Sequence, residues 1–272
     1  MKTHLTLLLS LLLPLSTASA DGGPKQVQFN TKIVSVPLDP AALRDAGLTL
    51  DSPDAMSNLG VLTAEKAAAV LLKLEKMPGH SLLLAPSFAT KGGVRATSES
   101  TREFIYPTEF TPPKLSTESS DKAVQLTPGQ VIAATPTTPR NFEMRMTGFK
   151  LEIEPTVGPD GKTIELNLSP ELVTFEGFMN FSSPIKAVAA DKDGKLSEAV
   201  LTENQVFQPV FSTMKTTTGV TVMSGNVLVL GHGGSGQLPS ATTKPDLTKL
   251  ADPAAKPTHA VFFFIQAKII GP

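Results

Sequence analysis

Apolar and polar residues alternate along several stretches of the chain, with the period of two that is typical of half-buried β-strands. In residues 26–36, QVQFNTKIVSV, apolar residues or threonine occupy the odd positions up to Ile33, and polar residues occupy the even ones. Residues 227–230 and 261–265 are apolar at every position, which predicts strands that are covered on both faces. These patterns predict a fold made mainly of strands.

Only two segments have the features of a helix. Residues 39–47 offer Asp39 as an N-cap, Pro40 at the first helical position and a closing glycine. Residues 63–77 place alanine, valine and leucine on one face at helical spacing, and Pro78 follows directly. The predicted class is therefore mainly β, an α+β fold with two short helices and mixed sheets built from β-hairpins.

Glycines mark the predicted turns between strands. Residues 81–97 are expected to form a hairpin that turns at Gly92 and Gly93, where glycine permits a positive φ. Pro159-Asp160-Gly161 is expected to close a second hairpin, and Gly225 a turn between two late strands.

A further glycine stands where the apolar alternation changes parity. Apolar residues occupy even positions before Thr147 and odd positions after Gly148, namely Phe142, Met144 and Met146 and then Phe149, Leu151 and Ile153. One inserted residue would keep these side chains on a single face, so Gly148 is predicted to lie in a β-bulge.

Three segments are set apart by composition. Residues 1–20 have a basic start, an apolar stretch and small residues at the end, which predicts a secretory signal peptide. Residues 107–139 are rich in proline, serine and threonine and predict a long loop, and residues 231–258 predict a polar loop. The remainder, 21–272, is interpreted as one domain.

Composition and charge exclude several classes of protein. The chain has no cysteine, so it has neither disulfides nor thiolate metal ligands. It has 24 basic and 25 acidic residues, and loss of Lys2 with the signal peptide leaves 23 against 25, a charge of −2. This balance argues against a nucleic-acid partner.

The candidate chemical motifs are incomplete. The loop GHGGSG, residues 231–236, has no accompanying nucleophile motif, and DKDGK, residues 191–195, lacks the later ligands of a calcium loop. The histidines show no metal-binding spacing: His4, His80, His232 and His259. Glu152, Glu154 and Glu165 could form an acid–base pair, or else a solvated or subunit-facing strand surface. The sequence therefore predicts no enzyme, catalytic residue, cofactor or metal site.

Six motifs occur in the same order as in a known family. They are VQFNTKIVSV, GVLTAEKAAAVLLKLEK, LLLAPSFATKGG, TGFKLEIEPTVGPDGKTIELNLSPELV, TTTGVTVMSGNVLVLG and FFFIQAKII. Residues 26–270 resemble the C-terminal pore domain of the bacterial secretins of type II secretion, type III secretion and type IV pilus machines. The polar segment 231–258 stands where that family has an apolar motif.

The resemblance implies an exported structural protein of the outer membrane or periplasm. It implies a homo-oligomer that assembles into a secretion or type IV pilus channel, with outer-membrane lipid and other components of the machine as partners. Phe175, Phe178 and Phe181 are candidates for membrane or subunit contact, or else for the core. A soluble periplasmic accessory without a pore, and an exported β-scaffold enzyme or ligand-binding protein, remain as alternatives.

Overall fold

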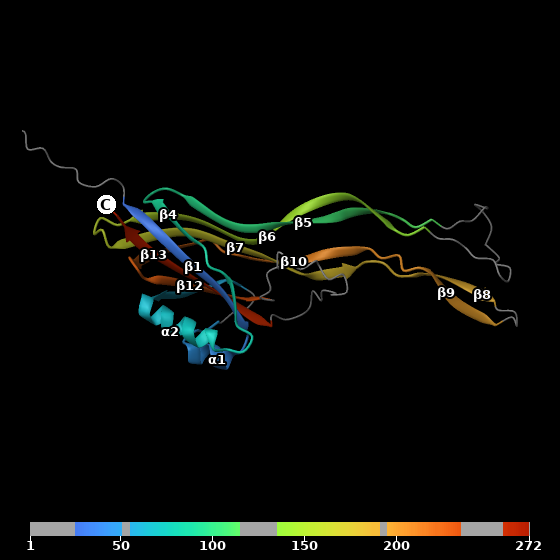
Figure 1. Cartoon of the computed structure of the whole chain (residues 1–272), viewed down its shortest axis with the longest axis horizontal. Coiled ribbons are helices and arrows are strands. Elements are labelled where there is room, and N and C mark those ends of the chain that lie inside the picture. Colours follow the sequence, from blue (N-terminus) through green and yellow to red (C-terminus); the bar gives the residue numbers. More distant parts are fainter. Residues whose placement is uncertain (1–24, 51–54, 115–134, 191–194, 235–257, 272) are drawn as a thin grey trace, which may run out of the picture.

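The computed structural model describes residues 25–50, 55–114, 135–190, 195–234 and 258–271. The molecule is elongated, with two stacked sheets and two helices at one end and an arm of long strands that extends from the other (Figure 1). The predicted signal peptide, residues 1–20, lies outside the described residues.

Most of the described residues lie in strands, which confirms the mainly β class. The helices are α1 (Pro40–Ala46) and α2 (Ala64–Glu75). The strands are β1 (Gln26–Pro37), β2 (Ser57–Leu62), β3 (Ser81–Leu84), β4 (Ser87–Lys91), β5 (Ala96–Thr111), β6 (Thr138–Val157), β7 (Thr163–Asn180), β8 (Ile185–Ala190), β9 (Leu196–Thr202), β10 (Phe207–Lys215), β11 (Thr218–Met223), β12 (Val227–Gly234) and β13 (His259–Ile270).

The strands form two main antiparallel sheets. Sheet A has the order β2-β12-β13-β1-β3, with β4 also paired to β1. Sheet B has the order β10-β7-β6-β5, with β11 also paired to β7. The β8–β9 hairpin forms a separate pair at the far end of the arm (Figure 1).

Sheet A is buried on both faces, as its uninterrupted apolar stretches predict. On β13, Phe263 and Ile265 belong to the core that sheet A shares with sheet B. The neighbouring Phe262 and Phe264 belong to a second core, formed with the two helices. Both helices begin as predicted, since the carboxylate of Asp39 accepts hydrogen bonds from the first turn of α1 and the hydroxyl of Thr63 caps α2.

The prediction that residues 81–97 form a hairpin is wrong, because the two strands do not pair with each other. Strand β4 pairs with β1 in sheet A, whereas β5 pairs with β6 in sheet B. The turn at Gly92 and Gly93 therefore carries the chain from one sheet to the other. Both sheets hold it, because the Gly92 N–H donates to the carbonyl of Lys25 at 2.9 Å and the Gly93 N–H to the carbonyl of Pro155 at 2.6 Å.

The turn at Gly225 also connects the two sheets. It follows β11, which pairs with β7 in sheet B, and precedes β12, which pairs with β13 in sheet A. The positive φ of 91° at Gly225 agrees with the predicted turn.

The two predicted loops are shorter than expected. Residues 107–111 and 138–139 continue β5 and β6, and residues 231–234 continue β12. Proline is tolerated at position 107 because β5 is the outermost strand of sheet B, where a missing N–H need not break the ladder. Residues 115–134 and 235–257 lie outside the described residues.

Candidate functional site on the free strands of sheet B

Sheet B divides into two ribbons as it leaves the sandwich. The pairing of β6 with β7 stops at Gly148 and Val173. Beyond this point β5 and β6 remain paired to their far ends, and β7 and β10 remain paired with each other. We call the two-stranded extensions the β5/β6 ribbon and the β7/β10 ribbon, and together they form the arm (Figure 1).

The division occurs at Gly148, which does not lie in a bulge. The β5–β6 register runs without a shift past this residue, with Thr101 opposite Gly148 and Ser100 opposite Phe149. A side chain is excluded for another reason: the φ of Gly148 is +119°, and a Cβ would lie 2.3 Å from the carbonyl oxygen of Ser100. The predicted bulge is therefore wrong, and glycine is required here because it permits both the positive φ and the close approach of β5.

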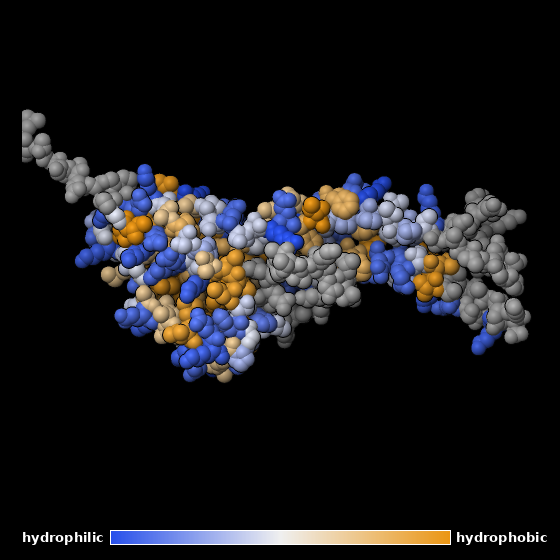
Figure 2. Space-filling model, in the orientation of Figure 1, coloured by the Kyte–Doolittle hydropathy of each residue, from blue (hydrophilic) through white to orange (hydrophobic). Residues whose placement is uncertain are grey.

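Because no residue is inserted, the apolar side chains of β6 change face at this point. Phe149 and Leu151 are fully buried against sheet A, whereas Phe142 and Met144 are 60% and 55% exposed. Ile105, opposite Met144 on β5, is 65% exposed on the same outer face. Apolar side chains also appear between hydrophilic ones on the surface of the arm in Figure 2.

The inner faces of the two ribbons meet through aromatic rings. Phe104 of β5 stacks on Phe175 of β7 with ring centroids 4.8 Å apart, and meets Phe211 of β10 edge to face at 5.3 Å. Tyr106 lies 5.9 Å from Phe211, and Phe178 lies 5.1 Å from Phe175. We call these five residues the aromatic cluster.

A bulge that the sequence did not reveal keeps this cluster together. Opposite Val210 and Phe211, the register of β7 skips one residue, Glu176. Phe175 and Phe178 are three positions apart and would otherwise point to opposite faces. Contact of Phe175 and Phe178 with membrane or another subunit stays a prediction. Within one chain both rings lie in the cluster, whereas Phe181 is 65% exposed.

The edge of β5 is contacted by the other terminal strand of sheet B. The side-chain amide of Gln208 on β10 donates to the carbonyl of Pro107 on β5 at 3.0 Å. Pro107 has no N–H, and in an antiparallel pair the N–H and C=O of one residue point to the same side. Pro107 and the other odd-numbered residues of this part of β5 therefore direct their backbone groups outward, to the free edge.

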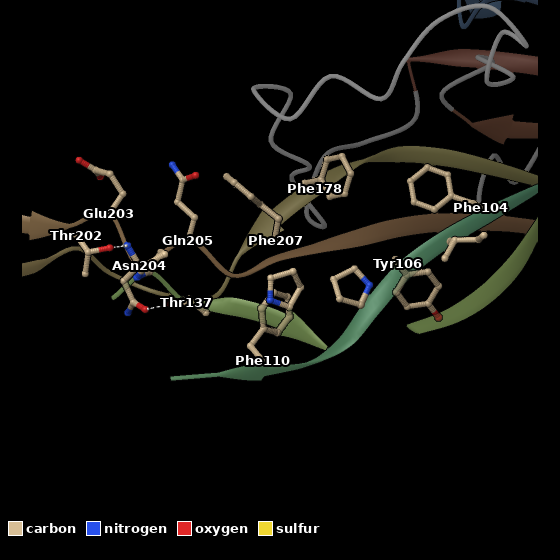
Figure 3. Close-up of a pocket in the computed structure, with 14 residues that line it drawn as sticks. Phe104, Tyr106, Phe110, Thr137, Phe178, Thr202, Glu203, Asn204, Gln205 and Phe207 are labelled. Carbon is tan, nitrogen blue, oxygen red and sulfur yellow. Dashed lines mark hydrogen bonds between the residues drawn. The ribbon is translucent and has the colours of Figure 1, made fainter. Parts of the chain in front are cut away.

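A cavity of about 670 Å³ lies between the ribbons, and Phe104, Tyr106 and Phe178 of the aromatic cluster form part of its lining (Figure 3). Aromatic and proline side chains make up much of its lining, and its titratable side chains are Tyr106 and Glu203. Figure 3 shows Phe110 and Phe207 from opposite ribbons, with Asn204 and Thr137 hydrogen-bonded at one end. This arrangement can shelter an apolar group but offers no pair of acids and bases for catalysis.

The carboxylates singled out in the sequence lie on the outer face of sheet B. Lys150 binds Glu152 at 2.9 Å, and this hydrogen bond and charge lower the pKa of Glu152. Arg95 pairs with Glu154 at 3.3 Å, and Glu165 is exposed on the same sheet. These contacts fit the interpretation as a solvated strand surface.

The remaining candidates form no chemical centre in the part of the chain that the structure describes. His232 lies in β12, with its ring against the carbonyl of Gly233. Residues 191–194 of the DKDGK motif lie outside the described residues. Among described residues, no group of three or more potential metal ligands occurs, and no helix is long and apolar enough to cross a membrane.

No protein-family profile and no curated protein matches the sequence. Among solved structures, the chain is similar to the secretin InvG of the Salmonella SPI-1 type III secretion injectisome, at 13% identity and a TM-score of 0.36, covering 93% of this chain and 66% of that one. It is similar to the type II secretin GspD of enteropathogenic Escherichia coli, at 13% identity and a TM-score of 0.36, covering 93% and 71%.

A third similar structure is the type IV competence pilus secretin PilQ of V. cholerae, at 16% identity and a TM-score of 0.30, covering 93% of this chain and 63% of that one. The chain thus spans just under two thirds of the InvG chain that it matches. All three are secretins, the family that the six sequence motifs resemble.

Proposed function

We propose that this chain is an exported, self-associating, secretin-like subunit. Copies pair edge to edge through sheet B and form a ring in or beneath the outer membrane, as part of a protein secretion or type IV pilus channel. The function is then a shape built from many copies and not a reaction. The observation that carries the proposal is the division of sheet B into two ribbons whose outer edges pair with no other strand among the described residues.

Within one chain, each ribbon has only two strands beyond the sandwich and contacts the other ribbon through side chains. An isolated two-stranded ribbon is at best marginally stable in water, and a third strand or a packing surface is needed to stabilise it. Each ribbon here extends beyond the sandwich, and β5 alone is 16 residues long. Strands from neighbouring copies would supply the missing pairing, and a closed ring would leave no free edge.

The outer face of the β5/β6 ribbon supports the same proposal. Its exposed apolar side chains are bounded by ion pairs, with Arg140 and Glu109 at 3.2 Å on one side and Lys150 and Glu99 at 3.4 Å on the other. Exposed apolar side chains that face each other across two strands, as Ile105 and Met144 do, are a feature of interaction surfaces.

The direct test is the mass of the purified chain in buffer and in detergent, by size-exclusion chromatography with light scattering. The proposal predicts a discrete species of many subunits in at least one of the two conditions. A single-subunit mass in both contradicts it. Fractionation of expressing cells then locates the species, since a membrane-bound ring sediments with the outer membrane and a soluble accessory appears in the periplasmic wash.

A matched pair of variants tests whether the β5 edge is the contact. Ile105→Pro removes an outward-facing N–H without removing a hydrogen bond to β6, so it is expected to block assembly while the chain stays folded. Ile105→Ala shortens the same exposed side chain but keeps the N–H, so it is expected to assemble more completely than Ile105→Pro. Equal assembly of the two variants contradicts pairing through this edge.

A further inference from the structure

We propose that the arm of the lone subunit is held closed by an internal latch between β5 and β10, and that assembly requires this latch to open. The inference rests on the proposed function and adds a regulatory step to it. The two terminal strands of sheet B, which would each pair with a neighbouring copy, instead contact one another within one chain.

The first component of the latch lies on the edge that assembly needs. The Pro107 carbonyl points away from β6, toward the free side of β5, and it accepts the hydrogen bond from Gln208 of β10. A neighbouring strand would have to lie within about 5 Å of β5 on this same side. The Gln208 side chain therefore competes with an incoming strand for that position.

The second component is the aromatic cluster. Phe211 of β10 contacts Phe104 and Tyr106 of the opposite ribbon, and the guanidinium of Arg145 on β6 lies 5.2 Å from the Phe211 ring centroid. Arg145 also donates a hydrogen bond to the hydroxyl of Thr213 on β10 at 2.9 Å. Phe211 and its neighbours on β10 thus hold the two ribbons face to face through side chains.

The latch is weaker than the sheets on either side of it. No backbone ladder between β5 and β10 occurs among the described strands, and the β6–β7 ladder has already ended at Gly148. The cavity of about 670 Å³ leaves the inner faces incompletely packed beside the aromatic cluster. Gly148 and Gly177, with φ of 119° and 146°, stand where the ribbons leave the sandwich and where β7 bulges. The arm can therefore open without disturbing the core of the sandwich.

An engineered cross-link tests the latch directly, because the chain has no cysteine of its own. In the mature chain carrying Tyr106→Cys and Phe211→Cys, a short bis-methanethiosulfonate reagent joins the ribbons, and dithiothreitol releases them. The cross-linked chain is expected to remain a single subunit, and to assemble once the reductant is added. Assembly of the cross-linked chain at the rate of the reduced chain overturns the latch.

A matched control places the same reagent within one ribbon. Glu109 and Arg140 face each other across β5 and β6, so Glu109→Cys with Arg140→Cys joins two strands that stay paired throughout. This cross-linked chain is expected to assemble at the same rate with and without reductant. If it is blocked as well, the effect comes from the reagent and the latch is not supported.

A single substitution gives an independent measurement of rate. Phe211→Leu removes the aromatic contacts and the cation–π contact while it keeps an apolar side chain. It is expected to speed assembly of the subunits about tenfold, because losing the interaction free energy of one or two aromatic pairs corresponds to about that factor. An unchanged or slower rate, in a chain with wild-type circular dichroism, contradicts the latch.

The outcomes separate the latch from the proposed function. If neither the wild-type chain nor the reduced variants assemble, the proposed function fails and the latch falls with it. If the wild-type chain assembles and the cross-link makes no difference, the proposed function stands and the latch alone is overturned.

Discussion

Asp160 shows how a single side chain fixes a turn of sheet B. Its carboxylate accepts hydrogen bonds from the backbone N–H groups of Lys162 and Thr163 and from the Thr163 hydroxyl. These bonds, the Thr163 N–H first, lower the pKa of Asp160 from 3.8 to about 2. The turn motif was predictable because all of its contacts are local in sequence.

The lowered pKa gives a pH dependence with a definite sign. The ionised carboxylate stabilises the folded chain fully above pH 3.8, and this contribution is lost as the pH falls through about 2. Asp160→Ala is therefore expected to lower the melting temperature at pH 7 and to differ less from the wild type as the pH approaches 2. Asp160→Asn, which keeps one acceptor oxygen, serves as the control. A difference between wild type and Asp160→Ala that stays constant over this range contradicts the assignment.

Gly148 and Gly225 are required for different structural reasons. Both have a positive φ, but only at Gly148 would a Cβ collide with backbone, at the carbonyl of Ser100. Gly148→Ala is expected to cost about 3 kcal/mol of unfolding free energy, and Gly225→Ala about 1 kcal/mol, by urea denaturation. Equal costs would show that the close approach of β5 is not what requires Gly148.

At the scale of the element, β6 combines two environments in one strand. The sequence pattern located the change at Thr147 and Gly148, but the bulge interpretation assumed that the apolar face must stay constant. The unshifted β5–β6 register shows that the face itself changes, because one half of β6 packs in the sandwich and the other extends into the arm. Local alternation could not show this, since it says nothing about which face is covered.

Two substitutions in β6 measure the change of environment. Leu151→Ala is expected to lower the unfolding free energy by about 2–5 kcal/mol, since Leu151 is fully buried in the core shared by the two sheets. Met144→Ser, in the exposed half, is expected to change it by less than about 0.5 kcal/mol. Denaturant unfolding of the dispersed chain measures both. A large loss for Met144→Ser would show that the outer face of the ribbon is covered within one subunit.

The helices and the doubly covered strands were predictable for the same local reasons. Asp39 and Gly47 cap α1 as the sequence indicates, and the apolar residues 261–265 are buried on both faces. The assignment of β4 and β5 to different sheets was not predictable, because it depends on β1 and β6, which are far away along the chain. The aromatic cluster was missed for a similar reason, since its members come from three strands and depend on the bulge at Glu176.

At the scale of the whole molecule, the sandwich and the arm differ in how completely their apolar side chains are buried and their strand edges are paired. The sandwich buries its apolar side chains between two sheets and two helices. The arm exposes apolar side chains on its outer face, has an open cavity between its ribbons and leaves strand edges unpaired by any backbone ladder among the described residues. This contrast is expected of a subunit whose arm completes its pairing only in an assembly.

The central claim is that copies of this chain pair through the free edges of sheet B. Negative-stain electron microscopy of the purified mature chain, in buffer and in detergent, tests it most directly. The account predicts closed rings for the wild type and for Ile105→Ala, and separate elongated particles for Ile105→Pro. Separate particles for the wild type under every condition, or rings for Ile105→Pro as abundant as those of the wild type, would contradict it.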